Sequence, residues 1–287
     1  VQAALMTWKA EDFETAAYAG GCVVSMMRSR AEWLAHPHAT ALAAQPLVSI
    51  EKIGDAAPRP WPAGDRSLAG LRVLDLSRVI AGPVAGRTLA AHGADVMLIS
   101  SPNLPAIPWL TIDTGRGKLS SFADLATEEG GAALRGLLAE ADIFSQGYRP
   151  QSIAALGFSP QDAARIRPGI VYVSLSAYGH AGPWAGRRGF DSLVQTSTGF
   201  NHAEGQAAGV EGPKELPAQV LDHATGYLMA FGAMMARARQ AREGGSWHVQ
   251  VSLARTGQWV WGLGRVANGF ATADLGFVYF YFCSSTK

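Results

Sequence analysis

The stretch from Leu68 to Ser101 constrains the fold of this chain more than any other. It contains two apolar runs, at 71–76 and 95–99, and between them a helical segment that we expect to open at Pro83 and close at Gly93. Proline suits a first helical turn because its missing N–H has no intrahelical partner there, and glycine suits the left-handed position just past a helix end. The stretch therefore predicts a βαβ unit with parallel, covered strands.

Gly82 and Gly86 lie four residues apart on one face of this helix, so its backbone can approach a sheet or a ligand closely. Helix N-termini that follow strands attract phosphates, which makes a nucleotide site one interpretation. The dinucleotide fingerprint G-x-G-x-x-G is absent, because the glycines here are spaced G-x-x-x-G. Close packing of the helix on a sheet is the other interpretation, and both remain open at this point.

The same alternation of strand and helix continues along the chain. Further strands are expected at 142–146 and 170–175, and helices at 122–139, after Ser159, and from Asp222 to about Glu243. This alternation predicts an α/β fold with a doubly wound parallel sheet. Two connections, at 103–118 and 177–217, are expected to be mostly loop, apart from a helical piece at 191–197 in the second.

Composition excludes several classes of function. The chain has 287 residues, a formal net charge of +1 and only 16% charged residues, which argues against nucleic acid as a partner. No apolar run is long enough to span a bilayer, and no secretory segment is evident, so we expect a cytoplasmic protein without a membrane partner. Two cysteines, Cys22 and Cys283, are too few for a disulfide framework or a metal site, and no metal is predicted.

The two ends of the chain differ in character from its centre. Residues 1–64 include a predicted short strand at 22–26 and a proline-rich linker at 56–64, and they do not look like the start of a domain. The α/β core is expected over 65–265. The remaining 266–287 end in an uncharged aromatic run, which is prone to aggregation if it is exposed.

Six stretches between residues 68 and 239 carry a family resemblance. They are LAGLRVLDLSRVIAGPVAGRTLAAHGADV (68–96), DTGRGKLSSFADL (113–125), ADIFSQGYRPQSIAALGF (141–158), RPGIVYVSLSAYGHAGPW (167–184), GFDSLVQTSTG (189–199) and VLDHATGYLMAFGAMMARAR (220–239). In this order they resemble the class III CoA-transferase family, which also includes α-methylacyl-CoA racemases. The resemblance implies a Rossmann-like sheet, an interlocked homodimer, and coenzyme A or acyl-CoA and a small organic acid as substrates, without a permanently bound cofactor.

The front of the chain also resembles this family. Residues 9–55 are similar to the family's closing segment, which normally follows the core. Here that segment precedes the core. The resemblance therefore implies a tandem or permuted arrangement, in which the tail of one unit is followed by the body of the next.

By resemblance, Asp222 is the nucleophile. Transfer of CoA between acids needs a carboxylate that attacks a thioester, and a helix N-terminus favours the ionised form of such a group. The helix that Asp222 opens has no further acidic residue until Glu243, which suits this role. Alternatively, Asp222 is an N-cap that accepts an N–H from Ala224 or Thr225, and the two roles are not exclusive.

The resemblance also implies a set of CoA-binding residues. Arg116 and Lys118 would face phosphates, Tyr148 could stack on the adenine, and the turn after the first core strand would border the pantetheine, namely Val79, Ile80, Ala81, Gly82 and Pro83. A solvated loop is the alternative for Arg116 and Lys118. The chain departs from the family at Ser100, Ser101, Leu119 and Ala155, where charged residues are usual, and these departures weaken phosphate binding.

These observations favour a CoA-transferase and leave three alternatives. An intramolecular CoA-transferase would isomerise one acyl-CoA without a second acid. A racemase is disfavoured because Phe190 stands where the family's racemases have a histidine, and proton transfer at an α-carbon then loses one base. A catalytically lapsed, CoA-binding scaffold half of a tandem protein is the third. The sequence does not identify the acids.

Overall fold

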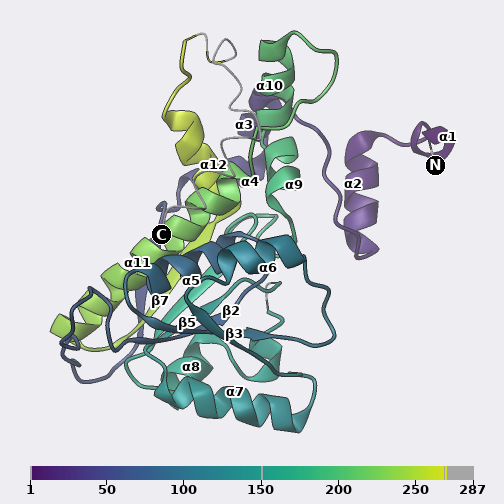
Figure 1. Ribbon diagram of the computed structural model, residues 1–287. Coiled ribbons are helices and arrows are strands. Elements are labelled where there is room, and N and C mark those ends of the chain that lie inside the picture. Colours follow the sequence, from purple (N-terminus) through teal and green to yellow (C-terminus); the bar gives the residue numbers. More distant parts are fainter. Residues whose placement is uncertain (1, 150, 268, 270–287) are drawn as a thin grey trace.

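The computed structural model describes residues 2–149, 151–267 and 269. They form one seven-stranded sheet with helices on both faces and a group of helices at one end (Figure 1). The strand order is β1-β7-β6-β5-β2-β3-β4. The strands are β1 (Ser49–Gly54), β2 (Arg72–Leu76), β3 (Asp95–Ser100), β4 (Lys118–Phe122), β5 (Ile143–Gln146), β6 (Val171–Ser176) and β7 (Ser246–Ser252).

The sheet is parallel from β4 to β7, and β1 adds to β7 in the antiparallel direction. The strands expected at 71–76, 95–99, 142–146 and 170–175 are present and parallel, so this prediction is confirmed. Starting at β2, the chain first adds strands on one side and then returns to add β5, β6 and β7 on the other. This is the doubly wound order of Rossmann folds.

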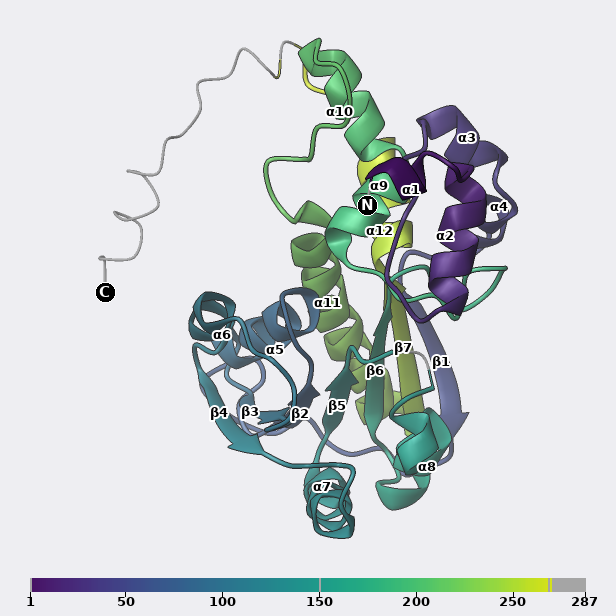
Figure 2. The same ribbon diagram turned by 90° about the vertical axis from the view of Figure 1, so that its right-hand side faces the viewer.

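Helices cover both faces of the sheet (Figure 2). On one face lie α5 (Ala81–Ala91) and α11 (Val220–Glu243), and on the other α7 (Glu128–Glu140) and α8 (Pro160–Ile166). Successive strand residues point to opposite faces. Val73 accordingly packs with the α5 and α11 side, whereas its neighbour Leu74 packs with the α7 and α8 side.

Helix α5 begins at Ala81, two residues before the predicted start, and Pro83 lies in its first turn. Its two glycines are where the structure needs the smallest side chain. A Cβ on Gly82 would lie 2.2 Å from the Cβ of Ser77, and one on Gly86 would lie 2.4 Å from a carboxylate oxygen of Asp75. The G-x-x-x-G spacing therefore serves close packing of the helix on β2 and the turn after it.

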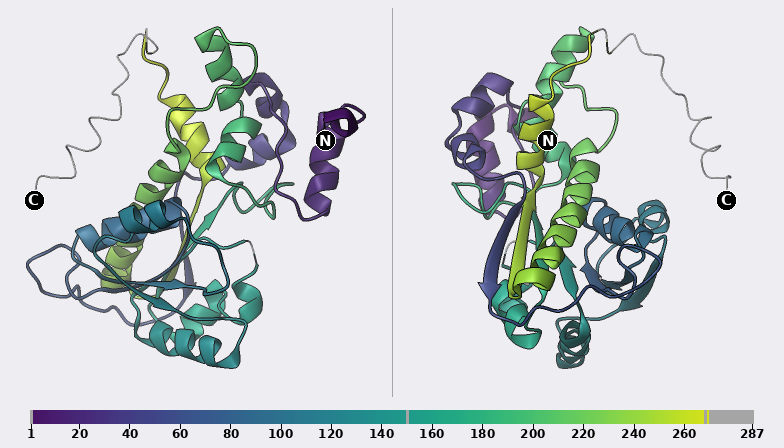
Figure 3. Two further views of the ribbon diagram at one scale, coloured as in Figure 1. Left: turned by 45° about the vertical axis from the view of Figure 1, so that its right-hand side comes forward. Right: turned by 90° about the vertical axis from the view of Figure 1, so that its left-hand side faces the viewer.

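The remaining helices gather beyond the carboxyl ends of the parallel strands (Figure 3). A core within this group contains Trp33, Tyr178 and Trp184, and the ring of Trp184 contacts the other two rings. No helix among the described residues combines the length and apolar character that a membrane span requires. The group of helices beyond the strand ends consists of α1 (Gln2–Leu5), α2 (Ala10–Ala19), α3 (Arg30–Ala35), α4 (Pro37–Ala43), α9 (Asp191–Ser197), α10 (Phe200–Ala208) and α12 (Leu253–Gly262).

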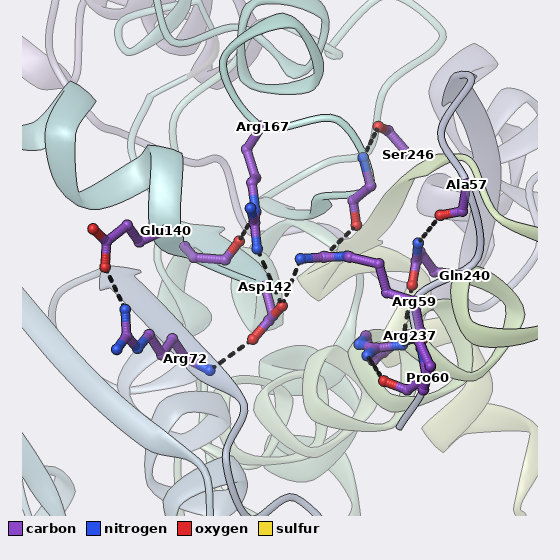
Figure 4. Close-up of polar contacts among 12 residues, drawn as sticks. Ala57, Arg59, Pro60, Arg72, Glu140, Asp142, Arg167, Arg237, Gln240 and Ser246 are labelled. Atoms are coloured by element: carbon purple, nitrogen blue, oxygen red, sulfur yellow. Dashed lines mark hydrogen bonds and ion pairs between the residues drawn. The ribbon is translucent and has the colours of Figure 1, made fainter. Parts of the chain in front are cut away.

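The linker at 56–64 is attached to the core at the opposite, amino end of the strands (Figure 4). The guanidinium of Arg237 donates to the carbonyl oxygens of Arg59 (3.1 Å) and Pro60 (2.9 Å). Asp142, directly before β5, forms an ion pair with Arg59 at 3.0 Å. Together with β1, these contacts join residues before 65 to the same sheet as the core.

Several expectations about irregular segments were wrong. The predicted loop at 103–118 contains α6 (Pro108–Thr114), and the predicted helix at 122–139 begins only at Glu128, because β4 and a turn precede it. Residues 22–26 form no strand, and α10 and the short 3₁₀ helix Ala154–Leu156 were not expected. The aromatic run at the end of the chain lies outside the described residues.

Candidate active site

A cavity of about 320 Å³ opens at the carboxyl ends of β2, β5 and β6. The strand order reverses between β2 and β5, and open α/β sheets bind ligands at such a switch point. Asp222 lines this cavity from the first turn of α11. The other lining residues lie mainly in four segments, 78–81, 147–149, 175–177 and 187–190, with Val23, Leu104 and Leu253.

Close contact between α11 and α5 brings Asp222 to the cavity. Gly226, one turn after Asp222, would place a Cβ 2.5 Å from the carbonyl oxygen of Ala81 and 2.8 Å from side-chain carbons of Val84. Only glycine permits this approach. Asp222 and the N-terminal turn of α5 consequently share one cavity wall.

Asp222 is not the N-cap of α11. The helix begins at Val220, with Gln219 as its N-cap residue, so Asp222 is the third helical residue. Its carboxylate makes no hydrogen bond or ion pair with any residue that the structure describes. The alternative capping role is therefore wrong, and the carboxylate is free to meet a ligand.

The expectation that the surroundings of Asp222 favour its ionised form is also wrong. Burial, and secondarily the negative charge of Asp191, raise the pKa of Asp222 to about 7. Asp191, the first residue of α9, is 1% exposed, and one of its oxygens accepts the backbone N–H of Asp222 at 2.8 Å. The count of acidic residues along α11 missed this carboxylate because it comes from another helix.

The residues predicted to bind CoA separate into two groups. Val79, Ile80, Ala81 and Tyr148 line the cavity together with Asp222. Val79 has a positive φ of 71°, which is rare for a β-branched residue and marks a constrained turn at the cavity wall. Gly82 and Pro83 lie behind this wall, where Gly82 faces Ser77 and the carbonyl of Pro83 accepts from Lys118.

Arg116 and Lys118 do not reach the cavity. The ammonium of Lys118 is 2.7 Å from a carboxylate oxygen of Asp75 and donates to the carbonyl of Pro83 at 2.8 Å, and both side chains of the pair are buried. Arg116 is exposed, with its guanidinium 3.9 Å from Asp113. The structure thus gives Lys118 a partner inside the protein rather than a phosphate, and it places Arg116 in the solvated position considered as its alternative.

Four arginines that were not predicted from the sequence line the cavity instead, namely Arg78, Arg149, Arg187 and Arg188. Arg78 donates to the carbonyl of Pro105, and Arg187 lies over the ring of Trp184 at 4.3 Å. Arg78 and Arg149 follow the ends of β2 and β5, and Arg187 and Arg188 lie in the loop after β6. Open α/β sheets bind ligands at this edge, so this position could have identified them as candidates. Guanidinium groups here suit a polyanionic ligand.

Two further predictions concern the histidine of racemases and metal ligands, neither of which was expected at this site. Phe190, where racemases of the resembled family have histidine, lines the cavity and is half exposed, so it places an apolar ring beside the site. Among the described residues, no group of three or more histidine, cysteine or acidic side chains could hold a metal ion. The ionisable side chains that line this cavity among the described residues are Asp222, Tyr148 and the four arginines.

Comparison with known proteins finds relatives that share this sequence and this fold. The sequence model of CoA-transferase family III matches residues 68–269. Acetyl-coenzyme A transferase nodX of Hypoxylon pulicicidum is 35% identical over 199 residues, which are 68% of this chain and 34% of that protein. An acyl-CoA transferase of Gibberella moniliformis is 31% identical over 268 residues, 88% of this chain and 47% of that protein. The chain therefore spans between a third and half of these relatives.

The match to the Gibberella protein covers so much of this chain that it necessarily includes part of residues 1–64. That relative thus also has matching sequence before the core.

Among solved structures, Rv3272 of Mycobacterium tuberculosis superposes with a TM-score of 0.61 at 30% sequence identity, covering 71% of this chain and 61% of that one. The chain belongs to CoA-transferase family III.

Proposed function

We propose that this chain transfers CoA between an acyl-CoA and a carboxylic acid through covalent intermediates on Asp222. A carboxylate oxygen of Asp222 attacks the thioester carbonyl, the C–S bond breaks, and CoA leaves as a thiolate. The thiolate then attacks the Asp222 carbonyl of the resulting anhydride, which releases the donor acid and leaves a CoA thioester on Asp222. The acceptor carboxylate reverses these two steps.

The observation that supports this proposal is a buried carboxylate at the wall of the cavity that has no hydrogen-bond or ion-pair partner within the described part of the chain. A carboxylate that accepts several hydrogen bonds or pairs with a cation is a poor nucleophile, because its lone pairs are already engaged. Asp222 has no such partner among the described residues, and its pKa of about 7 leaves a substantial ionised fraction near neutral pH. The Asp222 carboxylate is therefore poorly solvated and borders the cavity, and both properties suit a nucleophile.

The walls of the cavity support acyl-CoA as the substrate. The turn from Val79 to Ala81 offers backbone and small apolar groups at the switch point, which suits the pantetheine arm. Arg78, Arg149 and Arg188 supply positive charge for phosphates, whereas Arg187 is paired with the buried Glu14 at 3.5 Å. The presence of the first three arginines offsets the departures at Ser100, Ser101, Leu119 and Ala155, because the phosphate contacts need not come from those positions.

An exchange experiment tests the proposal. The protein is incubated with an acyl-CoA and isotopically labelled free acids of increasing chain length, and the label is followed into the acyl-CoA pool. We expect label to enter with at least one acid in the wild type, and at least about 10³-fold more slowly in Asp222→Asn. Exchange at near wild-type rate in the variant would refute the nucleophile.

Dependence on added acid separates the alternatives. An intramolecular isomerase would convert one acyl-CoA into another without any free acid, whereas the proposed reaction stops when the acid is omitted. A CoA-binding scaffold would bind CoA in a calorimetric titration and exchange no label. The half-exposed Phe190 gives no proton-transferring group where racemases have one, which favours the acid-dependent reaction.

We also propose that the chain forms a homodimer. Large apolar side chains are exposed on α6 and β4, where Trp109 is 80% and Phe122 is 74% exposed, and on α11, where Tyr227 and Phe231 lie one turn apart. Clustered apolar surface of this kind is typical of protein interfaces. Light scattering should give twice the chain mass at micromolar concentration, and a monomer would contradict the proposal.

A further inference from the structure

Asp191 is a buried carboxylate beside the site to which the proposed chemistry gives no role. It is 1% exposed and is the first residue of α9, and both of its oxygens accept hydrogen bonds. One oxygen accepts the backbone N–H of Asp222 at 2.8 Å, and the other accepts the side-chain amide of Gln195. Both oxygens of this buried carboxylate therefore have specific donors, unlike those of a carboxylate that only caps a helix at the surface.

Gln195 extends this contact along the segment that leads into α11. Its side-chain oxygen accepts the backbone N–H of Leu216 at 3.1 Å, and its amide group also donates to the carbonyl of Ala218 at 3.4 Å. The two side chains of α9 therefore hold the chain at residues 216, 218 and 222. Displacement of α9 would move the backbone of Asp222 directly.

The first turn of α11 depends on this contact. Gln219, its N-cap residue, forms no side-chain cap, so the N–H groups of the first turn lack the usual local acceptor. Asp191 supplies an acceptor from another helix, and the positive end of the α11 dipole compensates part of its buried charge. Burial raises the pKa of Asp191 as well, although its hydrogen bonds from the Asp222 backbone and Gln195 oppose this. In its ionised form the same carboxylate places a negative charge beside Asp222.

This charge acts differently on the two states of the nucleophile. Free Asp222 is an anion when it is ionised, whereas the anhydride and the thioester on Asp222 are neutral. Repulsion by Asp191 therefore raises the free energy of the ionised resting state and is relieved when the acyl group is transferred. In the attack on the thioester, the negative charge moves from the Asp222 oxygen to the sulfur of CoA, away from Asp191.

We propose that Asp191 is a positioning residue, which fixes the N-terminus of α11 together with Gln195, directs the Asp222 carboxylate into the cavity, and opposes negative charge on it. The proposal rests on the proposed function of Asp222. The other ionisable side chains around the site are the four cavity arginines, Tyr148 and His223, the neighbour of Asp222. Among the described residues none of these forms an ion pair with Asp222, and burial with the Asp191 charge accounts for its raised pKa.

Three substitutions separate the effect of holding the N-terminus of α11 in place from the effect of the Asp191 charge. Asp191→Asn keeps an oxygen for the Asp222 N–H and removes the charge. Gln195→Ala keeps the charge and removes the attachment of residues 216 and 218. Ser192→Ala, at the exposed neighbouring position of α9, is the matched control. The measurement is the pH profile of kcat and kcat/KM for acyl exchange, with the melting temperature of each variant.

We expect the acidic limb of the Asp191→Asn profile to move to lower pH by roughly one unit, because a like charge beside the nucleophile is gone. Gln195→Ala should lower kcat by about 10-fold or more at all pH values with little change in KM and no such shift, since misplacement of a reacting group acts on kcat. Ser192→Ala should superpose on the wild type.

A purely structural role would lower the melting temperature of Asp191→Asn without moving the acidic limb, and that result would overturn the proposal. If Asp191→Asn folds poorly, carbodiimide modification of Asp222 at low temperature, followed against pH, reports the same shift without turnover. An unchanged modification profile would be equally contradictory. If instead Asp222→Asn retains exchange activity, the proposed function itself fails, so the two failures are distinguishable.

Discussion

Two buried aspartates near the carboxyl ends of the parallel strands differ sharply in environment, and only one of them is the proposed nucleophile. Asp75 lies in β2 and is fully buried, and Asp222 lies in α11 and is 8% exposed. Asp75 has the ammonium of Lys118 at 2.7 Å and the hydroxyl of Ser77 as a donor. Asp222 has neither a cation nor a donor among the described residues.

The difference assigns the two groups to different tasks. A buried carboxylate paired with a buried ammonium is neutral as a unit, and it joins β2 to β4 beneath α5. A buried carboxylate without a partner destabilises its own ionised form, and Asp191 adds to this effect. The first arrangement holds two strands of the sheet together, and the second leaves a carboxylate without a counter-charge at the cavity, as the proposed nucleophile requires.

The largest expected effect comes from breaking the neutral pair. Lys118→Met leaves Asp75 as an uncompensated buried charge, which should lower the free energy of unfolding by about 3–5 kcal/mol. Arg72→Met is the control, because the Arg72–Glu140 pair is exposed and should contribute only about 0–1 kcal/mol. Urea unfolding of both variants checks this. A Lys118→Met variant within about 1 kcal/mol of the wild type would show that the pair is not structural.

The pH dependence of stability probes the unpaired carboxylate. The pKa of Asp222 is raised in the folded state, to about 7 from a usual 3.8, so between these values the folded protein binds a proton that the unfolded chain releases. Stability from this group is therefore complete below pH 4 and is lost as pH rises through 7, by on the order of 4 kcal/mol.

Unfolding curves of the wild type and Asp222→Asn across this range measure the effect. The difference between the two proteins should change steadily from pH 4 to 7 and then level off, because the variant has no carboxyl group to ionise there. Parallel curves at all pH values would mean that Asp222 is solvated and ionised like a surface aspartate, and the contrast with Asp75 would then disappear.

The glycines of α5 offer a smaller test. Gly86→Ala would place a Cβ 2.4 Å from the Asp75 carboxylate and 2.8 Å from the Lys118 ammonium, so it should destabilise by about 1–3 kcal/mol. Gly136→Ala, in the middle of α7 with no atom within 4 Å of the new Cβ, should instead stabilise by about 0.5–1 kcal/mol. Equal effects at both positions, measured by thermal unfolding, would contradict close packing at Gly86.

The strands β2, β3, β5 and β6 could be predicted from the sequence because their buried residues lie in short, mainly apolar runs. Their order in the sheet was not predicted. Strand β4 could not be predicted, since it is an exposed edge strand in which Leu119 is 65% and Phe122 is 74% exposed, so no run faces the core. Helix α10 was hidden for a similar reason, because its sequence is polar and contains Gly205.

The site was predictable to the extent that it lies on consecutive residues. Asp222 and the turn at Val79 follow from motifs that are local in the chain, and the structure brings them to one cavity. The contact between Asp191 and Asp222 joins residues 31 positions apart through the packing of two helices. Neither propensity nor spacing contains this information. The burial of Lys118 depends in the same way on β4, the strand that was missed.

The central claim is that Asp222 forms the covalent bond to CoA. Its most direct test is mass spectrometry of the wild-type chain and Asp222→Asn after incubation with an acyl-CoA and rapid acid quenching, followed by peptide mapping. The account predicts a mass increase equal to bound CoA on the peptide that contains Asp222, removable by hydroxylamine, and no increase in the variant. An adduct on another peptide, or an equal adduct in Asp222→Asn, would contradict it.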